Sequence, residues 1–374
     1  MSSGPEPIPG GAGMTVLERE GTGRVYRGTS RMYDPADDPS RATGVPVCAR
    51  VTSVAASDLR RLSERLLRAL LVSLSRRRFL GRIATRLPLT RAMVARFVAG
   101  QTLPSVLEAM ERLRRAGLHT TVDVLGESVH SPAAAVEAAE RYRRTLDALA
   151  AAGLDRNVSV KLSQVGLEID PALCRSNLER VLERADALGA FVRIDMEDHT
   201  ATDATLELVR AVRVAHSGVG VVVQAALRRS AADVDALIAE GVRVRLCKGA
   251  YNEPASVAFH DRAEVDRSYA ELMERLLVAG TYPAIATHDE RLLRRAVVIA
   301  RRNTITPDRF EFQMLYGVRR DLQERLVAAG WTVRVYVPYG SEWYPYFMRR
   351  LAERPANIAF VLRSVLRERR PRSS

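Results

Sequence analysis

The sequence predicts an α/β protein built as a distorted (β/α)8 barrel, with additional helices before the barrel. After Leu118, eight short runs rich in β-branched and apolar residues alternate with longer segments in which apolar residues recur at helical spacing. The eight repeats occupy about 240 residues, which is the usual size of such a barrel. A doubly wound open sheet is the alternative fold, but no G-x-G-x-x-G motif follows the first run.

The predicted strands follow one another in a regular order. They span residues 119–126, 158–165, 191–197, 218–226, 242–249, 283–287, 310–315 and 332–338. The intervening helical segments include residues 132–152, 173–188, 203–214 and 261–279. Because each helix returns the chain to the start of the next strand, the alternation predicts a parallel sheet covered by helices.

Three further segments are predicted outside the barrel domain, which we place at residues 118–365. Residues 1–57, rich in Gly, Pro, Ser and Asp, are predicted to form a flexible extension. In residues 58–117 leucines recur at helical spacing, with arginines between them in 58–86. This basic helix either lies on an anionic membrane surface or packs on the barrel with a solvated face. Residues 366–374 form a basic tail.

The composition excludes several classes of protein. With 47% hydrophobic and 27% charged residues, the 374-residue chain is neither largely disordered nor fibrous. It contains no run of about 18 apolar residues that would predict a membrane-spanning helix. Its three cysteines lack paired spacing and residues 1–30 lack a secretory signal pattern, so we expect a cytoplasmic protein. The net charge of +13 is spread along helices without a nucleic-acid-binding motif, and we predict no nucleic-acid partner.

Lysine is rare in this chain, which makes its positions informative. Only Lys161 and Lys248 occur among the 57 basic residues, and both lie at the ends of predicted strands. Barrel enzymes place their catalytic side chains at these ends. Carboxylates accompany the cations there, but cations such as Arg245 would repel a divalent metal ion, so we predict no metal site. The charge instead favours an anionic ligand, a phosphate-bearing cofactor, or both.

A series of motifs, most of them at these strand ends and the last on a helix after the final strand, resembles those of proline dehydrogenases, the flavin-dependent enzymes of proline catabolism. The motifs are VDVLGE (122–127), SVKLS (159–163), RIDMED (193–198), RLCKGAY (245–251), ATH (286–288), FQMLYG (312–317), YVPYG (336–340) and RRLAE (349–353). They occur in the family's order between about residues 60 and 362. The chain is most similar to the short monofunctional bacterial form.

The resemblance implies FAD-dependent oxidation of L-proline to Δ1-pyrroline-5-carboxylate. Hydride would pass to flavin N5, and electrons would reach a membrane quinone through peripheral contact with the inner face of the cell membrane. The same flavin barrel acting on hydroxyproline or another cyclic imino acid is the alternative. The sequence departs from the family pattern at Ala226, where a tyrosine is common.

The resemblance also implies roles for individual residues. Asp195 and Arg245 are the implied catalytic residues, with Arg245 donating to flavin N5. The implied substrate-binding residues are Lys161, Tyr251, Leu315, Tyr336, Arg349 and Arg350, of which the two adjacent arginines would grip the proline carboxylate. The implied cofactor-binding residues are Met196, Gln224, Arg245, Lys248, Gly249, Ala250, Thr287 and His288.

Overall fold

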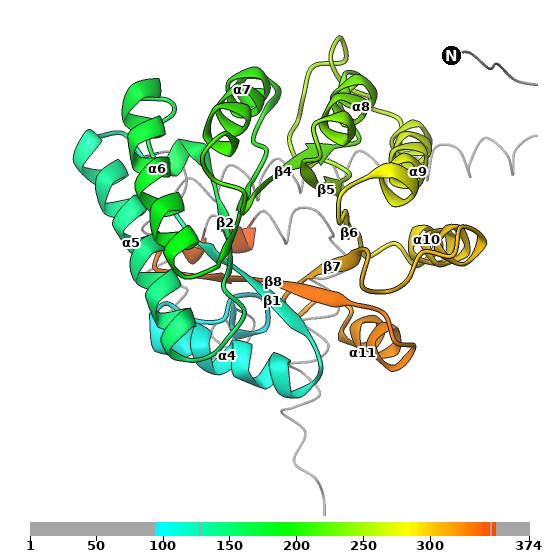
Figure 1. Ribbon diagram of the computed structural model, residues 1–374, viewed down its shortest axis with the longest axis horizontal. Helices are drawn as coiled ribbons and strands as arrows, with labels where there is room; N and C mark the ends of the chain where they lie inside the picture. Colours follow the sequence, from blue (N-terminus) through cyan, green and yellow to red (C-terminus); the bar gives the residue numbers. More distant parts are fainter. Residues whose placement is uncertain (1–93, 127–128, 345, 349–374) are drawn as a thin grey trace, which may run out of the picture. The chain divides into compact units, whose positions relative to one another are not determined.

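Eight parallel strands form a closed barrel in the computed structural model, which describes residues 94–126, 129–344 and 346–348. Neighbouring strands pair in sequence order, and β8 pairs with β1 to close the ring (Figure 1). The strands are β1 (His119–Val124), β2 (Asn157–Val160), β3 (Phe191–Ile194), β4 (Val219–Gln224), β5 (Arg243–Cys247), β6 (Ala284–Ala286), β7 (Glu311–Leu315) and β8 (Val333–Tyr339). The predicted (β/α)8 fold is confirmed.

Helices form an outer layer around the strands (Figure 1). They are α5 (Pro132–Ala151), α6 (Pro171–Ala187), α7 (Thr202–Arg213), α8 (Ser230–Ala239), α9 (Arg262–Ala279), α10 (Glu290–Arg302) and α11 (Arg320–Ala328). Local sequence sets several of the helix starts. Ser131 and Asp170 accept hydrogen bonds from the first turns of α5 and α6, and a proline follows each of them. A capping side chain followed by proline satisfies the first backbone donors and fixes the backbone for a helix.

Helix α4 (Leu103–Arg115) precedes the barrel and packs against both β8 and β1. Its buried residues Val106, Ala109 and Met110 join the main hydrophobic core. The helix therefore covers the seam where the last strand meets the first. Residues 1–93 and 349–374 lie outside the described part of the chain, and with them the predicted extension, the basic helix of residues 58–86 and the basic tail.

Six of the predicted strands extend past their observed carboxyl ends, two of them by three residues or more. Strand β2 stops at Val160 and is followed by the 3-10 helix η2 (Leu162–Gln164), while β3 stops at Ile194. At this edge a side chain replaces the neighbouring strand as hydrogen-bond partner, because Glu197 Oε1 accepts from the Ser163 backbone at 2.9 Å. The residues just past each strand thus turn across the barrel mouth, where their side chains become available to the site.

Apolar and polar side chains occupy opposite faces of the strands. Val158 and Val160 of β2 pack in the outer hydrophobic core, whereas the buried Ser159 between them belongs to a polar interior. The alternation follows from the two-residue period of a strand. Further buried polar residues on the barrel strands are Thr121, Asp123, Arg193, Gln224, Arg245, Glu311, Gln313 and Arg334. The barrel interior is therefore charged.

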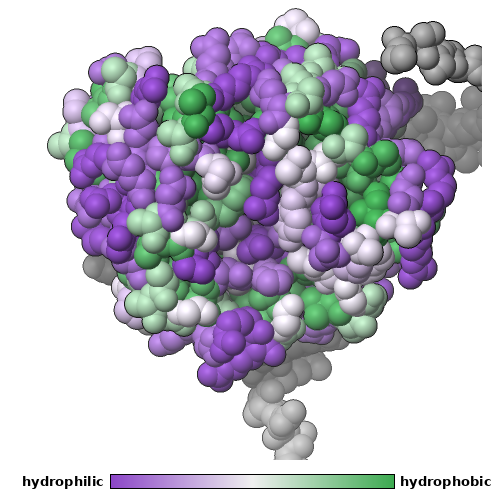
Figure 2. Space-filling view, viewed as in Figure 1, coloured by the Kyte–Doolittle hydropathy of each residue, from purple (hydrophilic) through white to green (hydrophobic). Residues whose placement is uncertain are grey.

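The surface of the protein differs from both the hydrophobic core and the charged barrel interior. The face seen in Figure 2 is mainly hydrophilic, with apolar residues in scattered patches. Within residues 94–126, 129–344 and 346–348, no helix has the length and apolar character needed to cross a bilayer.

Candidate functional site

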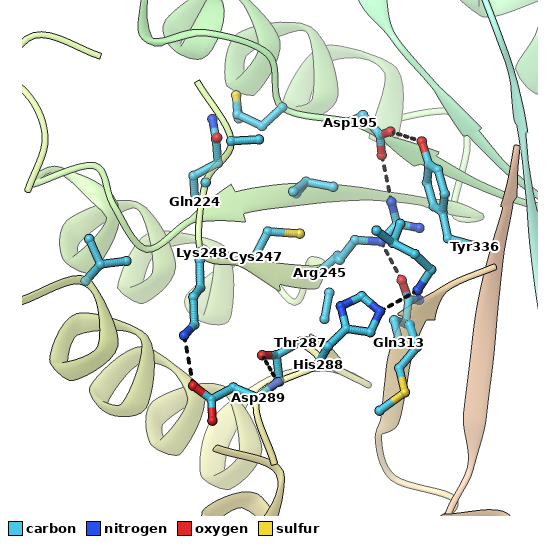
Figure 3. Close-up of a pocket in the computed structure, with 18 of the residues that line it drawn as sticks. Asp195, Gln224, Arg245, Cys247, Lys248, Thr287, His288, Asp289, Gln313 and Tyr336 are labelled. Atoms are coloured by element: carbon cyan, nitrogen blue, oxygen red, sulfur yellow. Dashed lines mark hydrogen bonds and ion pairs between the residues drawn. The ribbon is translucent and has the colours of Figure 1, made fainter. Parts of the chain in front are cut away.

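A cavity of about 850 Å³ lies at the carboxyl ends of the barrel strands (Figure 3). The structure brings together around it every predicted site residue that it describes. These residues are Lys161, Asp195, Met196, Gln224, Arg245, Lys248, Gly249, Ala250, Tyr251, Thr287, His288, Leu315 and Tyr336. Arg349 and Arg350 lie outside the described residues. The role of each residue remains a prediction.

Arg245 of β5 is held in the cavity by three hydrogen-bond acceptors. Its side chain is buried, and its Nη1 donates to Asp195 Oδ1 at 2.7 Å. The Nε group donates to Gln313 Oε1 at 2.6 Å and Nη2 donates to Ser159 Oγ at 3.0 Å. Because acceptors from two other strands and from the residue that follows β3 hold the planar guanidinium, its orientation is fixed. The guanidinium carbon also lies 5.2 Å from the ring centroid of Tyr336.

Asp195 connects Arg245 to a second cation. Its Oδ2 accepts a hydrogen bond from the Tyr336 hydroxyl at 2.8 Å and lies 3.5 Å from Lys161 Nζ. Lys161 donates in addition to Asp123 Oδ1 at 2.8 Å. Burial raises the pKa of Tyr336 well above its ordinary value, and Asp123 and Asp195 raise it further. The phenol is therefore a neutral donor at physiological pH, between two carboxylates and two cations.

Lys248 lies at another edge of the cavity (Figure 3). Its Nζ donates to Asp266 of α9 and lies 3.2 Å from Asp289 Oδ2. Asp289 also caps α10 by accepting from the Arg291 backbone at 3.1 Å. Burial opposes ionisation of Asp289, but the bonds from Arg291 and Lys248 prevail and lower its pKa to about 2. Arg262 and Arg291 also line this edge, together with Glu290, so cations and carboxylates both gather there.

The remaining predicted residues shape the wall between these two regions. The Leu315 backbone donates to His288 Nε2 at 2.9 Å, so the proton of the neutral imidazole lies on Nδ1. Gln224 Nε2 donates to the Glu197 carbonyl at 2.7 Å. Gly249 has a φ of +114°, and a Cβ built there would lie 3.1 Å from Ala226 Cβ. A side chain at this position would therefore be strained, and the unusual Ala226 lies directly beside this glycine.

The cavity fits a flavin dinucleotide, the cofactor expected from the sequence. Its volume of about 850 Å³ lies within the range of cofactor pockets, about 300–1,000 Å³. Lys248, Arg262 and Arg291 supply donors that can bind phosphates at one edge, where Asp266, Asp289 and Glu290 also lie, and Arg245 presents a fixed positive charge in the same cavity. The donor set and the size of the cavity thus agree with the predicted cofactor.

Some residues that support the site were not predicted from the sequence. Asp266 holds Lys248 from α9, and no motif of the sequence links these two residues. Glu311 and Arg334 form a buried ion pair in the barrel interior at 2.9 Å. A signal for Glu311 was present, because it lies two residues before Gln313 on the same strand and therefore on the same face.

Comparisons with known proteins give one consistent result. The family model described as proline dehydrogenase matches residues 106–363. The chain is 44% identical over 281 residues to a proline dehydrogenase of Deinococcus radiodurans, covering 74% of this chain and 90% of that protein. It is 40% identical over 279 residues to proline dehydrogenase 1 of Bacillus subtilis, covering 75% of this chain and 92% of that protein.

A solved structure has the same barrel. The crystal structure of proline utilization A (PutA) from Bdellovibrio bacteriovorus, inactivated by N-propargylglycine, superposes with a TM-score of 0.67 at 27% identity. The match covers 71% of this chain and 33% of that chain, so the present chain corresponds to about a third of the PutA protein.

Proposed function

Because this chain belongs to the proline dehydrogenase family, we propose that it binds FAD and oxidises L-proline to Δ1-pyrroline-5-carboxylate, the first step of proline catabolism. We further propose that a membrane quinone receives the electrons. The observation that carries the proposal is Arg245, held by three acceptors in a cavity large enough for the cofactor. A fixed cation of this kind stabilises negative charge that develops during a reaction.

The cofactor would be held by residues on both sides of the cavity. Lys248, Gly249 and Ala250 would hold it at the edge around Lys248, with Met196, Gln224, Thr287 and His288 along the wall. FAD, when bound, would accept a hydride from C5 of proline and later release the electrons to the quinone. Arg245 is already oriented by the protein, so little reorganisation accompanies the reaction.

Substrate binding would depend on a clamp for the carboxylate. Arg349 and Arg350 would grip this group by bidentate bonds, with Lys161 as a third cation. Tyr336, Tyr251 and Leu315 would pack against the ring. Holding both ends of a small substrate fixes a near-attack geometry, an effect that supplies up to about 7–11 kcal/mol in well-oriented reactions.

The oxidation removes a hydride, and with it the two electrons of a C5–H bond of proline. The ring nitrogen must be neutral so that its lone pair can form the new C5=N bond as hydride leaves C5. The proton that remains on nitrogen then passes to solvent, which gives the cyclic imine. Because Lys161 and Arg245 are both cationic, they disfavour a protonated amine beside them, whereas Asp195 and Asp123 limit this effect.

The test is a visible absorption spectrum of the purified protein before and after anaerobic addition of L-proline. We expect a flavin band that bleaches with proline and responds more weakly to hydroxyproline. A flavin band that is unchanged by proline but bleaches with another imino acid would show that the other imino acid is the substrate. A protein that takes up no FAD would refute the proposal. Arg349→Ala or Arg350→Ala should raise the KM for proline while FAD stays bound, and release of FAD would contradict the carboxylate clamp.

A further inference from the structure

A series of buried polar side chains runs from the cavity along the barrel interior to the amino ends of the strands. Arg245 and Gln313 line the cavity, whereas Glu311 and Arg334 lie at the opposite ends of β7 and β8. All four residues are buried, and the most exposed of them, Arg334, is 8% exposed. Because water has little access to them, their polar atoms must be paired mainly with other groups of the protein.

In this series, each side chain must donate or accept in a fixed direction because its neighbour can do only the opposite. Arg334 can only donate, and its Nε lies 3.0 and 2.9 Å from the two carboxylate oxygens of Glu311. The Glu311 carboxylate can only accept, so Gln313 must turn its amide nitrogen toward it, and Nε2 donates to Oε1. The amide oxygen of Gln313 therefore faces the other way, where it accepts from Arg245 Nε at 2.6 Å.

The charge of Glu311 is maintained despite its burial. Burial by itself would raise the pKa of this carboxyl, but the Arg334 charge, the bond from Gln313 and the nearby Arg193 outweigh burial and lower it. Arg334 is fixed in turn by donating from Nη1 to the Thr120 carbonyl at 2.7 Å. The ion pair is thus a permanent feature of the barrel interior.

We propose that Glu311 is a positioning residue for Arg245, acting through the amide of Gln313. The two ends of that amide have nearly the same shape, so sterics alone do not select its orientation. Without the carboxylate at position 311, the amide can turn and present Nε2 to Arg245 Nε, which places donor against donor. Asp195 and Ser159 would then hold the guanidinium without its third acceptor. This inference rests on the proposed function, in which Arg245 lies beside the flavin.

The test begins with Glu311→Gln in the FAD-loaded protein. We expect kcat with proline to fall about tenfold, because the Arg245 guanidinium loses one of the three acceptors that orient it. The KM should stay within about twofold, since the carboxylate clamp is not touched. The midpoint potential of bound FAD should fall by about 30 mV, which is a tenfold change for two electrons.

A double variant distinguishes positioning from a general loss of structure. Glu311→Gln combined with Gln313→Glu restores the alternation, because Arg334 can donate to the new amide oxygen at 311. The amide nitrogen there and Arg245 can both donate to the new carboxylate at 313. We expect kcat to recover to within about threefold of the original protein, although Arg334 has lost its adjacent charge partner.

Two further variants complete the design. Tyr282→Phe is the matched control, because it removes another donor to Glu311, at 3.4 Å, and leaves the orientation of Gln313 determined as before. We expect its kcat and potential to be unchanged. Gln313→Met retains the Glu311–Arg334 pair and so protects the fold if Glu311→Gln does not fold. It should show the same loss of kcat and of potential.

The outcomes separate this inference from the proposed function. If the unaltered protein holds no flavin or does not oxidise proline, the proposed function is wrong. If the unaltered protein is active but Gln313→Met retains its kcat and potential, positioning through Gln313 is refuted. Positioning is equally refuted if the double variant is no more active than Glu311→Gln, because both would then report only damage to the barrel interior.

Discussion

Replacing Gly220 with alanine should destabilise the barrel because no space exists for one more carbon. Gly220 of β4 lies in register with Arg193 of β3 and Arg243 of β5. A Cβ built there would lie 2.4 Å from the Arg243 carbonyl oxygen, 2.7 Å from Arg193 Nη1 and 2.8 Å from Phe191 Cζ. The absence of a side chain at this position admits the buried guanidinium of Arg193 into the barrel interior.

The size of the expected loss of stability depends on which atoms would have to move. The Arg243 oxygen is backbone of the adjacent strand, so relief of this contact requires β4 and β5 to separate locally. Overpacking a well-packed interior costs about 1–3 kcal/mol, and a clash with backbone in a closed barrel belongs at the upper end, about 3 kcal/mol. Gly153→Ala is the control. A Cβ there meets no heavy atom within 4 Å, and its φ of +64° leaves only left-handed strain of about 1 kcal/mol.

Thermal unfolding followed by circular dichroism, at one scan rate and with saturating FAD, measures this difference. At roughly 1–2 °C per kcal/mol for a chain of 374 residues, Gly220→Ala should lower the midpoint by about 3–6 °C and Gly153→Ala by about 1–2 °C. Equal losses in the two variants would refute the reasoning, because they would mean that the strands accommodate the extra carbon without cost.

Three further predictions concern the edge of the site and its surroundings. Lys248→Met should weaken FAD binding about tenfold in a flavin-fluorescence titration, since it removes a cation from the cofactor edge; an unchanged Kd would contradict this role. The pKa of Asp289 is lowered to about 2 because the bonds from Arg291 and Lys248 outweigh burial. The contribution of the ionised Asp289 carboxylate to stability is therefore complete above about pH 4 and is lost as pH falls toward 2. Asp289→Asn should flatten the pH dependence of unfolding in that range. An unaltered slope would argue against the ion pair. Burial, with a smaller contribution from Glu197, raises the pKa of the Cys174 thiol to about 12, so mass-spectrometric mapping should find Cys174 unalkylated by iodoacetamide at pH 8 until the protein unfolds. Alkylation of the folded protein would show that this region opens.

The architecture of the barrel could be predicted from local sequence. Strand and helix periodicity reflects which face of each element is buried, and this is a local property. All eight strands were predicted in their correct order, and the barrel closes as expected. The two lysines that follow strands, Lys161 and Lys248, were correctly expected at the strand ends, and both line the cavity.

The tertiary structure decided where strands stop and which charges meet. Strand β2 ends at Val160, and beyond it the Ser163 backbone donates to Glu197 of the loop after β3. Arg245 bonds to Asp195, 50 residues away, and to Gln313, 68 residues away. The two-residue period of a strand places each of these side chains inside the barrel, but it does not say which partner each one meets.

The sequence by itself thus determined the fold, the edge at which the site lies and the residue types gathered there. Only the closed barrel determined that Glu311 meets Arg334 of β8 and that Gln313 meets Arg245 of β5. The physical reason is that hydrophobic burial is averaged over many residues and leaves a periodic signal. A hydrogen bond instead depends on the positions of two atoms, which the strand register and the curvature of the barrel fix together.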